Sequence, residues 1–282
     1  MYQTLISATE LANHGANPDW LLVDCRFDLT KPDAGEAAYR AGHLPKAIYA
    51  HLDRDLSSPI TPTSGRHPLP DADKFAATLS RWGVSKTTQV VAYDADTGAY
   101  AARLWWLLRW VGHRAVAVLD GGFKAWSAAG LPTTTEVPAR TATRFEARAN
   151  REAWMDVQEV AEHVRRSDWR LLDARGPERY AGEVEPIDTV GGHVPGARNH
   201  PFATNLGDDA RFVAPEELRA RYERSQDGVA DDHTIVMCGS GVTACHLMLG
   251  LEVAGKPGAR LYAGSWSEWI RDPSRGIAKG RG

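Results

Sequence analysis

An internal repetition with a nearly constant offset constrains the fold of this chain more than any other feature of its sequence. Four landmarks occur twice, in the same order, along 282 residues. They are the strand ends at Asp24 and Asp173, the Gly-His turns at Gly42 and Gly192, the strand ends at Asp94 and Cys238, and the segments that start at Leu119 and Tyr262, with offsets of 149, 150, 144 and 143 residues. Repetition of this kind is typical of a duplicated structural unit, so the sequence predicts two similar domains in tandem.

The segment between the two copies has the composition of a linker. Residues 133–151 are rich in Thr, Ala, Arg and Glu and show no clear periodicity, which favours a connection across the surface. We therefore expect an N-terminal domain at residues 1–137, a linker at 138–152 and a C-terminal domain at 153–282.

Each half alternates short apolar segments with helical patterns. The sequence predicts strands at 20–25, 89–93, 115–119, 170–173, 234–237 and 260–262. It predicts helices at 8–14, 71–82, 99–110, 156–166 and 215–224, with Asp156 as an N-cap and Pro215 in a first turn. Short strands that alternate with helices indicate parallel α/β units. We expect an α/β fold in which each domain is a mainly parallel sheet flanked by helices.

One cysteine lies between a predicted strand and a predicted helix. Cys238 ends the apolar run 235–237, a Gly-Ser-Gly turn follows it, and helical spacing begins at Thr243. A thiol at this point lies among backbone N–H groups at the positive end of a helix, which stabilises a thiolate. The alternative is a buried structural cysteine. Because a glycine-rich turn has little packing use for a thiol, the pattern favours Cys238 as a nucleophile.

Charge and composition exclude several other classes of protein. The net charge is −3, so no basic face indicates nucleic acid or an anionic membrane as a partner. No apolar run reaches transmembrane length, and the first residues lack the pattern of a signal peptide. The three cysteines make neither a disulfide framework nor a CxxC zinc site. We expect no metal, no cofactor and a reducing cytoplasmic location.

The landmarks of the second half resemble those of a known family. They are Asp173-Ala174-Arg175, the Gly-His-Val-Pro-Gly turn at 192–196, the loop from Cys238 to Thr243, and the Gly-Ser-Trp-Ser-Glu-Trp segment at 264–269. Together they resemble the tandem-domain rhodanese-like sulfurtransferases over nearly the whole chain. The loop is similar to that of the 3-mercaptopyruvate-specific members, whereas thiosulfate-specific members usually place Arg and Lys after the cysteine.

The resemblance implies sulfane-sulfur transfer through a persulfide on Cys238. It implies that only the second domain is catalytic, since Asp94 stands at the equivalent position of the first domain and a carboxylate cannot carry a sulfane sulfur. Backbone N–H groups would hold the persulfide anion, and the loop serine would add a hydroxyl. The partners implied are a small-molecule sulfur donor and a thiol, cyanide or thioredoxin-like acceptor. The donor-contacting residues of the loop would be Gly239, Gly241, Val242 and Thr243, with Ser240 among the catalytic residues.

Binding of the donor's anionic group requires a cation. Arg179 matches an arginine that the family uses to hold a carboxylate or sulfonate, which suits the guanidinium fork. Without the resemblance, a solvated surface arginine is the simpler interpretation. Mercaptopyruvate-type members use a second arginine where this chain has Ile187 after Glu185-Pro186.

Two polar residues of the first half match positions that the family uses in catalysis. Asp53 and His67 resemble an Asp and a His proposed to work with the loop serine, here Ser240, and the histidine suits proton transfer. The alternative for His67 is a loop histidine that hydrogen-bonds only its neighbours. His43 and His193 occur in both halves, which favours a structural role for both.

The sequence leaves other functions to compare with transfer from 3-mercaptopyruvate. An uncharged loop does little to offset two negative charges of thiosulfate, which favours mercaptopyruvate as donor; thiosulfate:cyanide transfer is the alternative. A phosphatase of this fold needs an arginine six residues after the cysteine, where this chain has Ala244. A non-catalytic rhodanese-like binding module usually lacks the cysteine, so the presence of Cys238 disfavours it.

Overall fold

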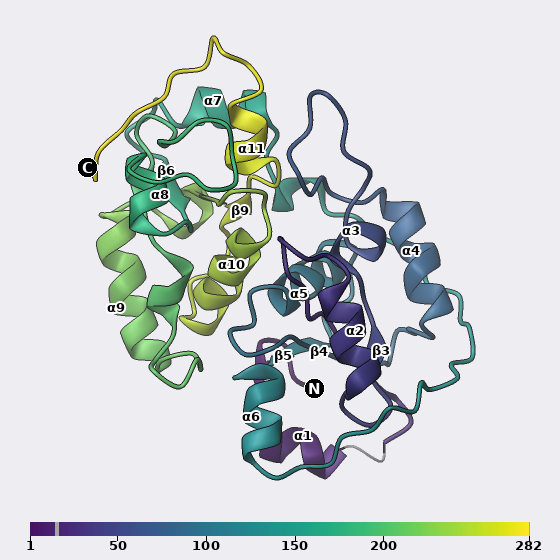
Figure 1. Cartoon of the computed structure of the whole chain (residues 1–282). Helices are drawn as coiled ribbons and strands as arrows, with labels where there is room; N and C mark the ends of the chain where they lie inside the picture. Colours follow the sequence, from purple (N-terminus) through teal and green to yellow (C-terminus); the bar gives the residue numbers. More distant parts are fainter. Residues whose placement is uncertain (15–16, 282) are drawn as a thin grey trace. The chain divides into compact units, whose positions relative to one another are not determined.

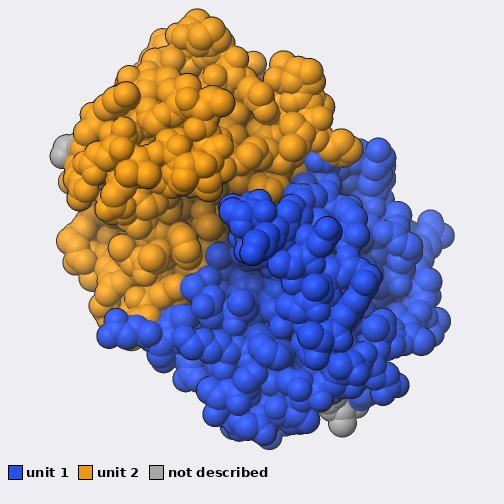
Figure 2. Space-filling view, in the orientation of Figure 1, with its two compact units in different colours: residues 1–58, 69–150, 208–212 blue, residues 59–68, 151–207, 213–282 orange. Residues whose placement is uncertain are grey.

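The computed structural model describes residues 1–14 and 17–281, which form two compact units (Figure 2). Unit 1 contains residues 1–58, 69–150 and 208–212, and unit 2 contains residues 59–68, 151–207 and 213–282. Each unit therefore includes one short segment from the other half of the sequence. For unit 2 this segment is 59–68, which contributes to the candidate site described below.

Unit 1 is built on a parallel sheet of five strands in the order β1-β5-β4-β2-β3 (Figure 1). The strands are β1 Leu5–Ile6, β2 Trp20–Asp24, β3 Ile48–Tyr49, β4 Gln89–Tyr93 and β5 Val116–Leu119. The helices are α1 Ala8–His14, α2 Ala34–Ala41, α3 Leu52–Asp55, α4 Ala72–Arg81, α5 Ala101–Trp110 and α6 Gly122–Ala128. Helix α5 packs against β4 and β5.

Unit 2 repeats this order with a parallel sheet β7-β6-β8-β9. The strands are β6 Arg170–Asp173, β7 Arg198–Asn199, β8 Thr234–Met237 and β9 Arg260–Leu261. The α-helices are α7 Val157–His163, α8 Pro177–Ala181, α9 Pro215–Gln226, α10 Thr243–Val253 and α11 Ser265–Trp269; the 3-10 helices are η1 Arg151–Ala153, η2 Phe202–Asn205 and η3 Asp231–His233. A parallel bridge between Trp154 and Leu261 stands where β1 pairs with β5 in unit 1. The predicted fold of two α/β domains with parallel sheets is confirmed.

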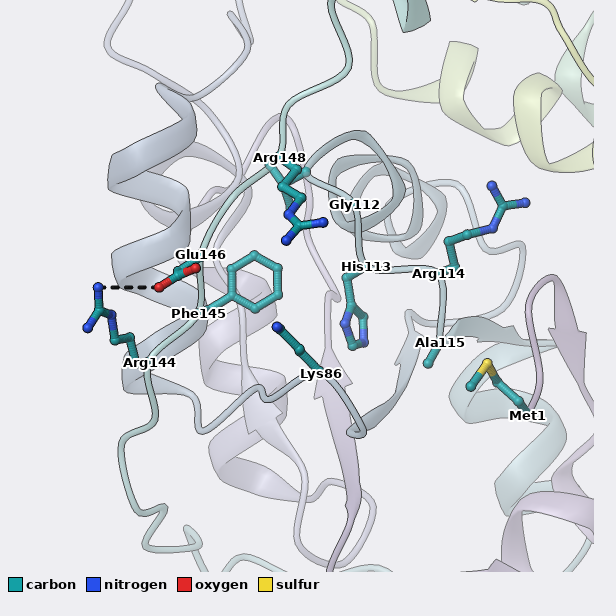
Figure 3. A pocket seen from close by; sticks show the side chains of 11 residues that line it. Met1, Lys86, Gly112, His113, Arg114, Ala115, Arg144, Phe145, Glu146 and Arg148 are labelled. Atoms are coloured by element: carbon teal, nitrogen blue, oxygen red, sulfur yellow. Dashed lines mark ion pairs between the residues drawn. The ribbon is translucent and has the colours of Figure 1, made fainter.

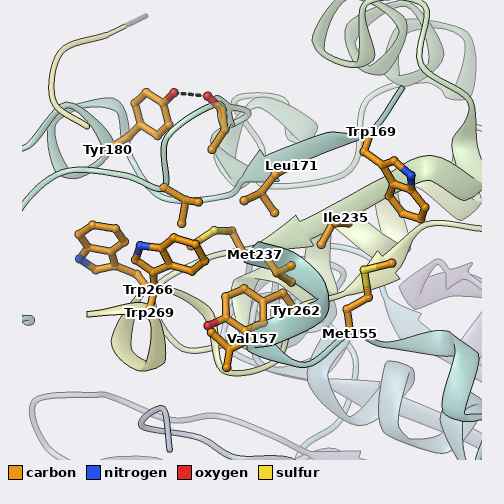
Figure 4. Packing of buried hydrophobic residues seen from close by; sticks show 13 residues of the cluster. Met155, Val157, Trp169, Leu171, Tyr180, Ile235, Met237, Tyr262, Trp266 and Trp269 are labelled. Atoms are coloured by element: carbon orange, nitrogen blue, oxygen red, sulfur yellow. Dashed lines mark hydrogen bonds between the residues drawn. The ribbon is translucent and has the colours of Figure 1, made fainter. Parts of the chain in front are cut away.

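The core explains why these segments form strands. All residues of β4, β5 and β8 are buried, as expected for parallel strands covered on both faces. In unit 2 the side chains of Leu171, Ile235 and Met237 extend from the sheet into a cluster with Tyr262 and Trp266 (Figure 4). This packing fixes the carboxyl end of β8, the central strand that leads into Cys238.

The predicted elements agree with the structure except at their ends. All six predicted strands are present within one residue, and Asp156 caps α7 through a reciprocal capping box with Glu159. Helix α7 ends at His163 rather than at residue 166, and α9 continues to Gln226 rather than ending at 224. Among the described residues, no helix has the length and apolar character needed to cross a membrane.

The repeated Asp-x-Arg segments hold each sheet to the following turn. In unit 2, Arg175 Nη2 donates to Asp173 at 2.6 Å and to the Gly192 carbonyl at 2.8 Å. In unit 1, Arg26 makes the equivalent contacts, to the carboxylate two residues before it and to the Gly42 carbonyl. These arginines brace the fold, and their recurrence in both units accounts for the repeated sequence landmark.

The two repeated histidines make the same contacts in each unit. His43 Nδ1 lies 2.7 Å from the Tyr39 carbonyl, and its ring stacks on the Tyr39 ring with a centroid distance of 3.9 Å. His193 Nδ1 lies 2.9 Å from the Tyr180 carbonyl, with a stacking distance of 3.8 Å. Both rings are buried. This geometry supports the structural role predicted from their recurrence.

Candidate active site

The sulfur of Cys238 lies at the carboxyl end of β8 and the N-terminus of α10. Cys238 is 2% exposed, and its Sγ accepts N–H hydrogen bonds from Ser240 at 3.4 Å and Gly241 at 3.1 Å. Backbone donors and the positive end of an 11-residue helix stabilise negative charge on the sulfur. The loop can therefore stabilise a thiolate, or a negatively charged group bonded to the sulfur. It does so with backbone groups, because the loop contains no charged side chain.

Gly241 is needed for this loop conformation. Its φ is +81°, in the left-handed region, and a Cβ at this position would overlap the Ala263 carbonyl oxygen. The loop is also held to the start of α11. Trp266 N donates to the Cys238 carbonyl at 3.0 Å, and Ser267 N donates to the Gly239 carbonyl at 2.9 Å. These contacts fix the direction of the N–H groups that face the sulfur.

The segment 59–68 brings a histidine to the cysteine loop within unit 2. His67 Nδ1 lies 2.7 Å from Ser240 Oγ, and both side chains are buried. Two contacts hold the preceding residues: Gly65 lies so close to the Gly264 carbonyl that it has no room for a Cβ, and the backbone N–H of residue 66 donates to Ser267 Oγ at 3.0 Å. The imidazole and the hydroxyl therefore form a preorganised pair beside Cys238.

Two arginines and two carboxylates form a cluster near the loop. Arg179 of α8 donates to Glu185 at 2.7 Å and to Asp188 at 3.1 Å. Arg66 forms an ion pair with the other oxygen of Asp188. Both carboxylate side chains are almost fully buried, at 6% and 5% exposure. The predicted cation Arg179 is thus present near the loop, with its charge already paired inside the protein.

Gly239 leaves space for these guanidinium groups. A Cβ at Gly239 would lie 2.9 Å from Arg66 Nη2 and 3.5 Å from both terminal nitrogens of Arg179. Burial lowers the pKa of the Arg66 guanidinium, and the charge of the nearby Cys238 opposes that shift. The loop itself contains no charged residue, but two guanidinium groups therefore lie beside Gly239, the residue after Cys238.

The sequence analysis missed Arg66, Glu185 and Asp188 as members of this cluster. Arg66 directly precedes His67, and the two carboxylates flank Ile187, whose side chain is 44% exposed. The only signal was adjacency to residues already singled out. The ion pair between Arg66 and Asp188 spans 122 positions, and no local pattern indicates such a contact.

The remaining predicted residues occupy different places. Val242 is buried and precedes α10, and Thr243 is its half-buried first residue. Asp53 is exposed in α3 of unit 1, where its backbone N–H donates to His51 Nδ1 at 3.1 Å. The structure brings Cys238, Ser240, His67 and Arg179 together within unit 2, and Asp53 belongs to the other unit.

The two other cysteines are also buried. Cys245 Sγ lies 3.2 Å from the Gly241 carbonyl, one turn into α10. Cys25 follows β2, and burial raises the pKa of its thiol well above the usual value, with Asp24 and Asp94 adding to the shift. Cys25 is therefore a neutral thiol at physiological pH, and its side chain is buried in unit 1.

Asp94 occupies in unit 1 the position that Cys238 occupies in unit 2. Its buried carboxylate accepts backbone N–H bonds from Gly98 at 2.9 Å, Tyr100 at 2.8 Å and Ala101 at 3.2 Å. Burial raises the pKa of this carboxyl group, and these hydrogen bonds oppose the shift. The duplicated loop thus directs backbone N–H groups at a side chain in both units, the Asp94 carboxylate in unit 1 and the Cys238 sulfur in unit 2.

A separate pocket of unit 1 is lined by basic side chains (Figure 3). It has a volume of about 570 Å³ and includes Lys86, Arg114 and Arg148. The His113 ring lies in this pocket beside Phe145, with its Nε2 2.9 Å from the Thr88 carbonyl. The pocket contains no nucleophilic cysteine and is not the site of thiol chemistry. Within residues 1–14 and 17–281, no cluster of three His, Cys, Asp or Glu side chains has metal-binding geometry.

Comparisons with known proteins agree with this geometry. A family model described as the rhodanese-like domain matches the chain twice, at residues 7–129 and 156–272. The chain is 46% identical over 278 residues to a protein of Pseudomonas aeruginosa named "Probable 3-mercaptopyruvate sulfurtransferase", covering 98% of each chain. It is 33% identical over 294 residues to the thiosulfate sulfurtransferase of Rattus norvegicus, covering 100% of this chain and 97% of the rat protein.

Solved structures show the same architecture. The 3-mercaptopyruvate sulfurtransferase from Leishmania major superposes with a TM-score of 0.84 and is 33% identical in sequence. The match covers 96% of this chain and 76% of the Leishmania chain. The similarity therefore extends over both units.

Proposed function

Because the chain belongs to the rhodanese-like domain family, we propose that it is a sulfurtransferase that carries sulfane sulfur on Cys238, with 3-mercaptopyruvate as its donor. The observation that carries this proposal is the pair of backbone N–H bonds to Cys238 Sγ at the N-terminus of α10. The donor is supported by the relatives named 3-mercaptopyruvate sulfurtransferase, which match nearly the whole chain.

The first half-reaction transfers sulfur from the donor to the enzyme. The Cys238 thiolate attacks the donor sulfur, an S–S bond forms, and the donor C–S bond breaks with its electron pair left on carbon as the enolate of pyruvate. The proton that leaves the donor thiol ends on this carbon and gives pyruvate. The product on the enzyme is Cys–S–S⁻, which the N–H groups of Ser240 and Gly241 stabilise.

The second half-reaction regenerates the thiolate. An acceptor thiolate or cyanide attacks the outer sulfur, the S–S bond breaks, and its electron pair returns to Cys238. Small thiols, thioredoxin-like dithiols and, in the laboratory, cyanide are the acceptors that we propose. A cytoplasmic location, which keeps Cys238 reduced between turnovers, is part of the same proposal.

We assign Ser240 and His67 to the donor's keto oxygen. Their 2.7 Å hydrogen bond lets the hydroxyl donate to the enolate oxygen while the imidazole takes part in the proton transfer to carbon. Asp53 would support this pair, as the family resemblance implies. Arg179, with Gly239, Gly241, Val242 and Thr243, would hold the donor, its guanidinium facing the carboxylate.

The first domain, residues 1–137, is proposed to have no sulfur-transfer activity of its own. Asp94 replaces the nucleophile there, and its carboxylate already occupies the ring of backbone N–H groups. The catalytic domain is residues 153–282, joined to the first by the linker 138–152. Residues 59–68 of the first half contribute His67 to the catalytic unit.

Thiosulfate is a second candidate donor. Arg66 and Arg179 beside Gly239 provide cations that the loop sequence itself lacks, and the rat relative is named a thiosulfate sulfurtransferase. The paired carboxylates Glu185 and Asp188 offset these two charges, so the two negative charges of thiosulfate meet little net attraction. This balance favours mercaptopyruvate.

The test is a comparison of kcat/KM for 3-mercaptopyruvate and thiosulfate, with cyanide as acceptor and thiocyanate as the measured product. We expect mercaptopyruvate to be preferred by at least about tenfold, which corresponds to about 1.4 kcal/mol. A tenfold preference for thiosulfate would reject the proposed donor and keep the reaction class. Loss of activity with both donors in Cys238→Ser, but not in Cys245→Ser, is expected in either case.

A further inference from the structure

We propose that Arg66 is a second donor-binding cation, and that Asp188 occupies the place of the donor's anionic group until the donor displaces it. This inference rests on the proposed function and goes beyond it. It identifies the residue that compensates for Ile187, which stands where an arginine is expected.

The position of Arg66 is fixed by its neighbours on both sides. The backbone N–H of Arg66 donates to Ser267 Oγ at 3.0 Å, and Gly65 before it packs against Gly264. His67 after it bonds to Ser240 at 2.7 Å. The backbone of Arg66 is therefore anchored to the cysteine loop and to α11. An anchored backbone limits the positions that the guanidinium can take, as expected for a preorganised binding residue.

The guanidinium of Arg66 borders the residue that follows the nucleophile. Its Nη2 lies 2.9 Å from the position of a Cβ on Gly239, and the terminal nitrogens of Arg179 lie 3.5 Å from the same point. Two guanidinium groups thus flank one small space next to Cys238. The Nε of Arg66 is buried and has no hydrogen-bond partner, so a donor remains there for a ligand.

Asp188 binds both guanidinium groups at once. One carboxylate oxygen pairs with Arg66 Nη1, and the other accepts from Arg179 Nη2 at 3.1 Å. An anionic carboxylate or sulfonate of a donor would make the same pair of contacts. The side chain of Asp188 is 5% exposed, so it is buried against the two guanidinium groups.

The segment that carries Asp188 can release it. Residues 184–191 form neither helix nor strand, and Val184 and Ile187 expose large apolar side chains to solvent. Within this segment, Ile187 N and Asp188 N both donate to Glu185 Oε1, each at 3.1 Å. Displacement of one carboxylate by another leaves the charge of the arginine pair balanced, so neither guanidinium group is left buried without a counter-charge during the exchange.

Steady-state kinetics with 3-mercaptopyruvate test the proposal. In Arg66→Gln we expect KM to rise about tenfold with kcat changed less than about threefold, and Arg66→Lys to recover part of the loss. In Asp188→Asn we expect KM to fall about threefold or more, because the competing charge is gone. Arg166→Gln is the control, since Arg166 pairs with Asp168 on an exposed turn.

A binding measurement separates this inference from the proposed function. Pyruvate, which keeps the carboxylate and keto group of the donor, is titrated calorimetrically into Cys238→Ser with and without Arg66→Gln. We expect Arg66→Gln to weaken pyruvate binding about tenfold, whether or not the wild type transfers sulfur. Equal affinity for pyruvate with and without Arg66→Gln would overturn the role of Arg66. A KM of Arg66→Gln equal to that of Arg166→Gln would overturn it as well. A rise of KM in Asp188→Asn overturns the displacement by the donor.

Discussion

The imidazole Nδ1 of His67 lies 2.7 Å from the hydroxyl of Ser240, across 173 positions of sequence. Ser240 in turn directs its backbone N–H at the sulfur of Cys238. Ser240 therefore contacts His67 through its side chain and Cys238 through its backbone. A change of the side chain removes the first contact and retains the second.

Ser240→Ala is expected to lower kcat/KM for 3-mercaptopyruvate by about 10- to 100-fold, because the enolate oxygen loses its hydroxyl donor. His67→Gln should have a similar effect, and the double variant should lose little more than either single one, since the two side chains act as a pair. The His200–Ser225 pair has the same 2.7 Å geometry elsewhere in unit 2, so Ser225→Ala is a matched control. Additive losses in the double variant would contradict the pairing.

The two glycines of the loop should respond differently to alanine. Gly241→Ala adds a Cβ at φ +81° against the Ala263 carbonyl, and should destabilise unit 2 and abolish persulfide formation. Gly239→Ala meets the ends of two flexible side chains, Arg66 at 2.9 Å and Arg179 at 3.5 Å, so the protein should fold and mainly KM should rise. Thermal unfolding and steady-state kinetics of both variants provide the comparison. A fully active Gly241→Ala would show that the loop tolerates another conformation.

Asp94 is expected to stabilise unit 1 rather than catalyse. Asp94→Ala leaves the N–H groups of Gly98, Tyr100 and Ala101 without their acceptor and should lower the free energy of unfolding by about 3 kcal/mol. Asp94→Asn keeps the shape and one acceptor oxygen and should cost less. Urea denaturation measures both. Sulfur transfer per folded molecule should stay at the wild-type level, and a selective loss of kcat in Asp94→Asn would instead indicate a catalytic contribution from this unit.

A buried histidine should make stability depend on pH. His200 is hydrogen-bonded to Ser225 and Asn205, and burial lowers its pKa from 6.5 to about 4. The unfolded chain takes up a proton as the pH falls through 6.5, whereas the folded protein does so only near 4. Stability is therefore lost as the pH falls between these values, by about 2 kcal/mol between roughly pH 7.5 and pH 5.

Urea denaturation at these two pH values, with wild type and His200→Gln, tests this contribution. Acidic groups contribute equally to both proteins, so the difference between them isolates the histidine. We expect His200→Gln to lose about 2 kcal/mol less on acidification than the wild type does. An identical loss would mean that His200 titrates normally in the folded protein.

Local signals explain which parts of the fold were predictable. Strands such as β4 and β8 are short, fully buried apolar runs bounded by polar residues, and the strand–loop–helix around Cys238 is contained in 20 consecutive residues, from Thr234 to Val253. Asp156 caps α7 through contacts three residues apart. In contrast, α3, α8 and α11 have four or five residues, too few for a helical period to be visible.

The candidate site was predictable only where its residues are local to the loop. Cys238 and Ser240 follow from the loop itself, and His67 and Arg179 came from the family resemblance. The loop contains no charged residue, yet Arg66 reaches it from a segment that packs with the other half of the chain. Such a contact depends on tertiary packing between distant segments, which neither periodicity nor spacing encodes.

The most direct test of the account is intact-protein and peptide mass spectrometry after treatment with 3-mercaptopyruvate. We predict an adduct with the mass of one sulfur atom on the peptide that contains Cys238, its removal by cyanide, and its absence in Cys238→Ser. Cys25, a neutral buried thiol, and Cys245 should carry none. Full sulfur transfer by Cys238→Ser, or an adduct on another cysteine in the wild type, would contradict the central claim that Cys238 is the sulfur carrier.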